Sequence, residues 1–223
     1  MGFYKKLQEQ TVRERDNLFN LGIIRQSLAG NVSRETYIAF LIEAYHHVKH
    51  TVPLLMACGS HLPERLEWLR EAVVKYIQEE TGHQEWILND IAACGADKEK
   101  VRNGRPSLPT ELMVAYAYDT VNRNNPVGFF GMVQVLEGTS IALALQAAEA
   151  IQESLGLPNQ AFTYLKSHGA LDIEHMAFFE SLMNRITSKN DQEAVLHGAR
   201  VFYKLYAEIF LSLPSSEKRL IAA

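Results

Sequence analysis

Helical periodicity runs through almost all of this 223-residue chain and is the feature that most limits what it can fold into. Apolar residues recur three and four positions apart, and no segment shows the strict alternation of a half-buried strand. Breaks rich in Gly, Pro, Asn and Ser separate the periodic segments. The pattern predicts an all-α chain of about seven helices. The expected helices span residues 3–18, 34–57, 64–93, 110–122, 126–153, 159–186 and 191–213.

Several breaks carry residues that start or end helices. Ser33, Asn125 and Asn159 are of the types that cap a helix N-terminus. Cys58 and Cys94 each precede a glycine, as residues at helix C-termini often do. We therefore expect a helix to start after each of Ser33, Asn125 and Asn159, and a helix to end at each of the two cysteines.

Length and charge place the chain among ordinary single-domain proteins. We expect one domain over residues 1–223, because a chain of this length buries a sizeable core. A formal net charge of −4 gives no basis for binding nucleic acid or an anionic membrane. The opening MGFYKKLQEQTVRERDN predicts an amphipathic helix and not a secretory signal. With 2 cysteines, too few for a disulfide framework, we expect a cytoplasmic protein.

Residues 127–148 form the one stretch whose length and apolar character approach those of a membrane span. Gln134 and Glu137 lie near its middle. A helix that is apolar on nearly all sides but carries an acidic residue is typical of the centre of a helical bundle. We therefore expect a central core helix and no membrane association.

A polar triplet interrupts the apolar stripe of the helix expected at 159–186. His168, Asp172 and His175 are spaced i, i+4 and i+7, so they fall within an arc of roughly 60°. Leu165 and Phe179 project from the same side. The pattern predicts that all three polar groups face the core.

Two more helices turn polar groups toward the core. Glu80 and His83 are three positions apart and lie over one side of the helix expected at 64–93. Glu79 is turned by about 100° from Glu80, so we expect it on the flank, exposed to solvent. Glu137 is the only charged residue within residues 127–148. Three helices therefore each place acidic or imidazole groups inside.

Buried carboxylates need compensation. Removing the partner of a buried ion pair costs about 3–5 kcal/mol, against a typical net stability of about 5–15 kcal/mol. No basic residue occurs between Arg123 and Lys166, and Lys75 and Arg185 lie away from the polar stripes. A cation held by the three histidines and three carboxylates compensates all six groups. A hydrogen-bonded polar core around a metal-free pocket is the alternative.

The donor types favour particular metals. Mixed imidazole and carboxylate ligation suits iron or manganese, whereas closed structural zinc sites favour thiolates. An inward Glu-x-x-His together with a lone Glu137 able to bridge is typical of dinuclear carboxylate sites in helical bundles. The constellation therefore predicts iron, with manganese as the second choice.

The helix expected at 34–57 carries a further polar face. Glu43, His47 and His50 share one side, next to the apolar stripe of that helix. Helix packing, a place in the pocket wall or behind the ligands, and direct ligation all remain open for this group. We place Glu43 and His47 behind the ligands or in the pocket wall, together with Tyr45 and Phe130.

With these residues laid out, the chain resembles the heme-oxygenase-like di-iron oxidases, a branch of the heme-oxygenase-like superfamily. The resemblance rests on the number and order of the helices, on the Glu80 and His83 pair, on Glu137, and on His168-x3-Asp172-x2-His175. It implies a seven-helix heme-oxygenase-like bundle with two Fe ions that activate dioxygen, and Glu137 as the bridging catalytic group. The ligands that it implies are Glu80, His83, Glu137, His168, Asp172 and His175.

Other branches of the superfamily fit less well. The TenA thiaminase II branch uses a nucleophilic Cys on the helix that corresponds to 126–153, where residues 126–148 contain none. The pyrroloquinoline-quinone synthase branch uses a basic pocket of His and Arg, and the inner helices here lack Arg. Self-sacrificing p-aminobenzoate synthases carry a Lys where this chain has Gln146 and Ala147.

The resemblance thus implies an iron-dependent oxidoreductase that uses dioxygen to oxidise a small organic substrate. The implied reactions are oxidative C–C cleavage, decarboxylation and N-oxygenation. A homodimer is also implied. The alternatives are a metal-free enzyme like TenA or pyrroloquinoline-quinone synthase, and a non-catalytic small-molecule-binding module of the same fold.

Overall fold

The computed structural model describes residues 2–214, apart from the side chains of residues 168–174. All regular structure in this part of the chain is helical, which confirms the predicted all-α class. Three short 3₁₀ segments lie at η1 (Glu64–Leu66), η2 (Pro126–Phe129) and η3 (Asn159–Ala161). The α-helices are α1 (Phe3–Gln10), α2 (Val12–Phe19), α3 (Gly22–Leu28), α4 (Arg34–Val48), α5 (Thr51–His61), α6 (Glu67–Glu80), α7 (His83–Ala93), α8 (Lys98–Arg102), α9 (Leu108–Arg123), α10 (Phe130–Leu155), α11 (Thr163–Arg185) and α12 (Lys189–Ser212).

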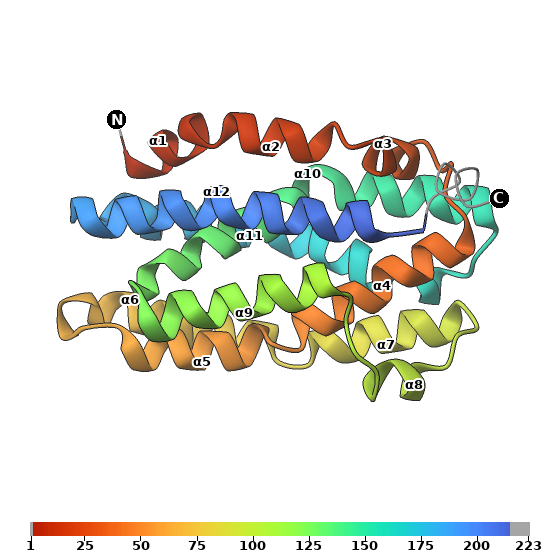
Figure 1. The fold of residues 1–223 in the computed structure, drawn as a ribbon, viewed down its shortest axis with the longest axis horizontal. Coiled ribbons are helices and arrows are strands. Elements are labelled where there is room, and N and C mark those ends of the chain that lie inside the picture. The colour runs from red at the N-terminus through yellow and green to blue at the C-terminus, as the bar shows by residue number, and fades with distance from the viewer. Residues whose placement is uncertain (1, 215–223) are drawn as a thin grey trace.

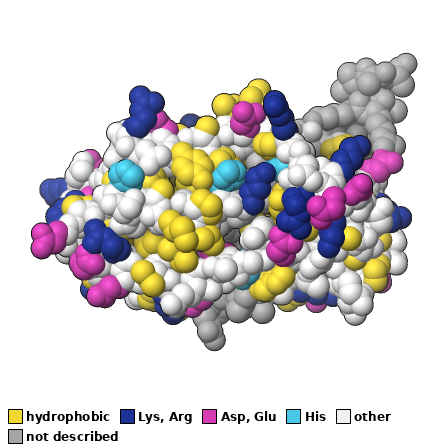
Figure 2. All heavy atoms as spheres, turned by 90° about the horizontal axis from the view of Figure 1, so that it is seen from below, with side chains coloured by type: hydrophobic (Ala, Val, Ile, Leu, Met, Phe, Trp, Pro, Cys, Tyr) yellow, Lys and Arg dark blue, Asp and Glu magenta, His cyan; other side chains and the backbone are white. Residues whose placement is uncertain are grey.

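The helices form a bundle around α10. Helices α11 and α12 pack along α10, and α3 and η2 cover its two ends. Figure 1 shows α1, α2 and α3 along one edge of the bundle and α5, α7 and α8 along the opposite edge. The face of that second edge carries acidic and basic side chains intermixed around a central area of hydrophobic and histidine side chains (Figure 2).

The segment Pro126–Leu155, which contains η2 and α10, is long and apolar enough to cross a membrane by length and composition alone. In the structure 61% of its most apolar window is buried inside the chain. Its side chains pack against α11 and α12. The expected role of this segment as a core helix of the bundle agrees with that burial.

Close backbone contact joins α10 to α12. A Cβ on Gly131 would collide with the backbone at Ala199, and a Cβ on Gly198 would collide with the carbonyl of Gly128. Both contacts lie at the N-terminal end of α10. Glycine at these positions therefore lets the two backbones approach closely and fixes where α10 enters the bundle.

Several helices predicted as continuous are interrupted, so the expected count of seven was wrong for the part of the chain that the structure describes. The helix expected at 3–18 is divided at Thr11, and the helix expected at 34–57 is divided at Lys49 and His50. The helix expected at 64–93 ends at Glu80 and restarts at His83. Gly82 adopts a left-handed φ of +97° there, which a continuous right-handed helix does not allow.

Two short helices were not predicted. Helix α3 lies between the helices expected at 3–18 and 34–57, and α8 lies between those expected at 64–93 and 110–122. Each has fewer than eight residues, too short for apolar periodicity to reveal it. In α8, the side chain of Asp97 accepts hydrogen bonds from the amides of Glu99 and Lys100, and this cap starts the helix.

The predicted helix ends were partly correct. Ser33 accepts a hydrogen bond from the Thr36 amide at the start of α4, and Asn125 accepts one from the Val127 amide. The prediction for Asn159 was wrong, because this residue lies within η3 and its side chain accepts from Gln152 instead.

Cys94 is the C-cap of α7, and Gly95 follows it with a left-handed φ of +79°. This confirms the predicted helix end. Cys58 lies inside α5, which continues to His61, so the helix end predicted there was wrong. Gly59 keeps helical geometry and packs against Val73 of α6. Glycine at that position thus serves close helix packing and not termination.

Candidate metal centre

Glu80 and His83 meet across the break between α6 and α7. Oε2 of Glu80 lies 3.0 Å from Nδ1 of His83, and the two side chains are 12% and 5% exposed. Trp86 stacks on the His83 ring with centroids 4.1 Å apart. The predicted proximity therefore exists, but it comes from a tight turn at Gly82 and not from one helical face.

His175 of α11 lies between carboxylates from two other helices. Its Nδ1 atom lies 3.8 Å from Oε1 of Glu137 on α10, and its Nε2 atom lies 3.3 Å from Oε2 of Glu79 on α6. The ring of Tyr76 meets the His175 ring edge-on at 6.0 Å. Side chains from α6 and α10 thus converge on one imidazole of α11.

Glu79 is only partly exposed, because its side chain, on the flank of α6, is 33% exposed to solvent. We expected it on the exposed flank of its helix, yet it contacts the buried imidazole of His175. Its other carboxylate oxygen, Oε1, lies 3.7 Å from Nζ of Lys75. The last turn of α6 lies beside α11, so a position on the flank of α6 still faces a neighbouring helix.

A cavity of about 170 Å³ lies beside these groups. Glu80 and Glu137 both form part of its wall, together with Tyr76 and His47. Most of the remaining wall is aliphatic or aromatic and comes from α3, α4, α5, α10 and α12. Both carboxylates therefore face the same largely apolar space.

Of the predicted pocket residues, the structure places His47 in the cavity wall but not Glu43, Tyr45 or Phe130. Glu43 instead accepts hydrogen bonds from the amide and hydroxyl of Ser107, at the start of α9. Tyr45 and Phe130 are buried in the surrounding core. Helix α4 is buried on more than one side. The periodicity of its sequence therefore does not show which side faces the cavity, because that depends on the neighbouring helices.

The wall also holds Tyr206 and Tyr164, which the sequence analysis did not single out. The ring of His47 meets that of Tyr206 edge-on at 6.0 Å. Burial raises the pKa of the Tyr206 hydroxyl well above its usual value, so it stays protonated at neutral pH. Aromatic residues on amphipathic helices are usually core residues, and the sequence offered no signal that separated these from the rest.

Two predicted ligands, His168 and Asp172, lie outside the side chains that the structure describes. Among the described side chains, no group of three or more His, Cys, Asp or Glu residues lies close enough together to hold a metal ion. The four described candidates form two pairs, Glu80 with His83 and Glu137 with His175.

The family of this chain follows from its sequence. A profile described as iron-containing redox enzyme matches residues 38–207, which include α5 to α11 and most of α4 and α12. The chain belongs to this family. A search of curated protein sequences finds no significant match.

Solved structures share the fold of this iron-containing redox enzyme family member. A domain of unknown function with a heme oxygenase-like fold from Shewanella denitrificans is 24% identical, with a TM-score of 0.86 over 99% of this chain and 95% of that one. Heme oxygenase-1 from Synechocystis, in complex with heme, is 12% identical with a TM-score of 0.80, covering 100% and 96% of the chains. A TenA homologue from Pseudomonas syringae is 14% identical with a TM-score of 0.76, covering 95% and 93%. These similarities confirm the predicted heme-oxygenase-like fold.

The donors in this family member suit iron. Glu80, His83, Glu137 and His175 offer carboxylate oxygens and imidazole nitrogens, the hard and borderline donors that iron accepts. The ion pairs described above for Glu80 and Glu137 are with histidines and not with Lys or Arg. Carboxylate and imidazole groups that lie together in this way form a donor set that a bound cation fits.

Thiol chemistry does not belong to this site. Cys58 and Cys94 are buried free cysteines that do not line the cavity. Burial raises the pKa of the Cys58 thiol to about 12 and that of Cys94 to about 11. Both thiols are therefore protonated and unreactive at neutral pH.

Proposed function

We propose that this member of the iron-containing redox enzyme family is a non-heme oxidase that holds two Fe ions and uses dioxygen to oxidise a small organic substrate. The proposed ligands are Glu80, His83, Glu137, His168, Asp172 and His175. One observation carries the proposal: Glu80 and Glu137, from different helices, face the same apolar cavity, and each is paired with a histidine. Manganese is the second metal that these donors suit.

Bound iron would supply the oxidising power by reducing dioxygen. The chain's own residues orient the donors. His83 is held between the Glu80 carboxylate and the ring of Trp86. His175 is held between Glu137 and Glu79, and we propose that Glu137 bridges the two metal positions.

The cavity contributes in two ways. Its apolar wall excludes bulk water from the space in front of Glu80 and Glu137, which strengthens electrostatic interactions there and limits side reactions. It also binds apolar parts of a substrate by burying their surface. Hydrolysis by a TenA-type nucleophilic Cys is disfavoured, because both thiols lie outside the cavity wall.

Anaerobic reconstitution with Fe(II) tests the proposal. The protein is loaded with Fe(II), freed of excess metal, and analysed for iron per chain. Oxygen uptake is then followed with an electrode against the same concentration of free Fe(II). We expect up to two iron ions per chain, and oxygen uptake above the free-metal rate with at least one of three classes of candidate substrate: fatty acids, amino acids and uncharged long-chain alcohols.

Matched variants make the result specific. Glu80→Ala should lower iron content, whereas Glu71→Ala, an exposed glutamate on the same helix, should not. Iron bound without oxygen uptake above free Fe(II) under any of these conditions would replace the oxidase proposal with a binding role. Failure to bind iron at all would overturn the metal centre itself.

A further inference from the structure

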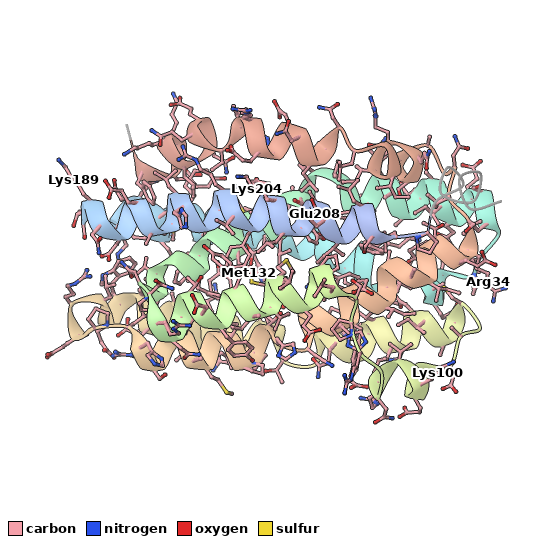
Figure 3. The ribbon with its side chains drawn as sticks, viewed as in Figure 1. Arg34, Lys100, Met132, Lys189, Lys204 and Glu208 are labelled. Atoms are coloured by element: carbon pink, nitrogen blue, oxygen red, sulfur yellow. The ribbon has the colours of Figure 1, made fainter. Side chains whose placement is uncertain are left out.

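The cavity extends along α10 on both sides of Glu137. Its wall includes Met132 on one side of Glu137 and Ala147 on the other. At about 1.5 Å per residue, these positions lie about 8 Å and about 15 Å along the helix from Glu137. Met132 lies in the interior of the bundle (Figure 3) and is 3% exposed. The carboxylate of Glu137 therefore lies partway along the cavity and not at one of its ends.

Helix α5 forms one end of the cavity. The thiol of Cys58 on α5 donates to the carbonyl of Pro126, just before α10 begins. Thr51 and Leu55 of the same helix line the cavity with Phe129. We call this part the α5 arm.

Helix α3 forms the opposite end. Gly30, just after α3, packs against the carbonyl of Ala150 so closely that a Cβ would collide with it. Ile24 and Leu28 of α3 line the cavity beside Ala147 and Ile151. We call this part the α3 arm, and the two arms lie at opposite ends of α10.

The charge of the wall limits what binds. Among the described residues that line the cavity there is no Lys or Arg, and the acidic residues are Glu80 and Glu137. The other polar groups of the wall are neutral hydroxyls and the imidazole of His47. An anionic head group in either arm would lose its hydration without gaining a cationic partner from the wall.

We propose that the substrate is an elongated, uncharged, apolar molecule that occupies both arms, so that an internal position of its chain, and not a terminal head group, lies beside Glu137 and Glu80. That the bound molecule is a substrate rests on the proposed oxidase function. Its binding geometry is independent of that function and is measurable without metal.

Displacement of a neutral fluorescent dye tests the proposal in the metal-free protein and again in the anaerobic Fe(II)-loaded protein. The competitors are tetradecanol, octanol, tetradecanoate and tetradecylamine. We expect tetradecanol to bind at least about tenfold more tightly than octanol, because the longer chain buries more methylene groups. We also expect it to bind more tightly than either charged analogue.

Plugging variants locate the two arms. Thr51→Phe fills the α5 arm and Ala147→Phe fills the α3 arm, while Ala142→Phe adds the same ring at an exposed position of α10 outside the cavity. Each plugging variant should bind tetradecanol about tenfold or more less tightly, and its affinity for octanol should be almost unchanged. The control should change neither, and circular dichroism melting confirms that each variant is folded.

Three outcomes would overturn the proposal. An effect from only one plug would mean that the chain occupies one arm and ends at Glu137. Tighter binding of tetradecanoate or tetradecylamine than of tetradecanol would mean that a charged head group is recognised. Absence of displacement by any competitor in folded protein would mean that the cavity does not bind such chains. Because dye displacement in metal-free protein needs neither iron nor oxygen, failure of the oxidase function leaves this measurement intact.

Discussion

Oε2 of Glu79 lies 3.3 Å from Nε2 of His175, and Nδ1 of the same imidazole faces Glu137. Glu79 also pairs with Lys75, whose ammonium lies 4.2 Å from the centre of the Phe178 ring. Lys75 is about half exposed, whereas His175 is buried. Glu79 thus lies between the protein surface and the candidate metal centre, and we infer that its carboxylate helps to orient the imidazole.

Glu79→Ala should therefore lower the affinity for Fe(II) by about 10–100-fold, as expected when a carboxylate that orients a metal-binding histidine is lost. Glu79→Gln keeps an oxygen that can accept from Nε2 and should retain more of the affinity. The measurement is anaerobic titration with Fe(II), together with the ¹⁵N spectrum of His175 in the metal-free protein, which reports its tautomer. An affinity and a tautomer equal to those of Glu71→Ala would show that the contact has no role.

Replacing the α11 histidines should reduce the number of metals bound. We expect His175→Ala and His168→Ala each to lower the iron content below one per chain, because each removes an imidazole from the proposed ligand set. His197→Ala on α12, a histidine outside the cavity wall, serves as the control. Metal analysis after reconstitution decides the matter, and an unchanged iron content in both variants would refute the assignment.

Glu137→Ala should abolish oxygen uptake above the rate of free Fe(II). Its carboxylate faces the cavity beside His175, where we propose that it bridges the two metals. Glu137→Gln keeps the shape of the side chain but loses its charge, so this variant should also show no oxygen uptake above the rate of free Fe(II). The electrode measurement is made at equal bound iron, and uptake at the rate of the unaltered protein would exclude a bridging role.

Asp191 should make the stability of the protein depend on pH at acidic values. Burial alone would raise the pKa of Asp191, but hydrogen bonds from Arg65 and Asn125 outweigh it and hold the pKa below its ordinary value. A carboxyl whose pKa is lower in the folded state contributes stability above its unfolded pKa and loses that contribution as pH falls through the folded value.

Asp191→Asn should accordingly reduce the free energy of unfolding by about 1–3 kcal/mol at neutral pH. The difference between the two proteins should shrink as the pH falls below about 4. Urea unfolding at several pH values measures this difference in the free energy of unfolding. Asp97→Asn, at an exposed aspartate that caps α8, is the comparison variant. A difference that stays constant down to the acid transition would contradict the ionic role of Asp191.

The resemblance to a known family implied the heme-oxygenase-like fold. The sequence pattern by itself determined the helical class and the core position of residues 127–148. These properties follow from local repetition: apolar residues three and four positions apart require a helix, and a helix apolar on most sides must be covered by others. The caps at Ser33 and Asn125 were readable for the same reason, because a capping side chain bonds to amides only two or three residues away.

Only the tertiary structure decided which side chains meet. Glu80 and His83 meet through the turn at Gly82, and Glu79, on the flank of α6, faces α11. Likewise His47 lines the cavity, while Glu43, one turn earlier on α4, accepts hydrogen bonds from Ser107 at the start of α9. Periodicity reports the direction of a side chain from its own helix axis, but the identity of the group it meets depends on how neighbouring helices are placed around that axis.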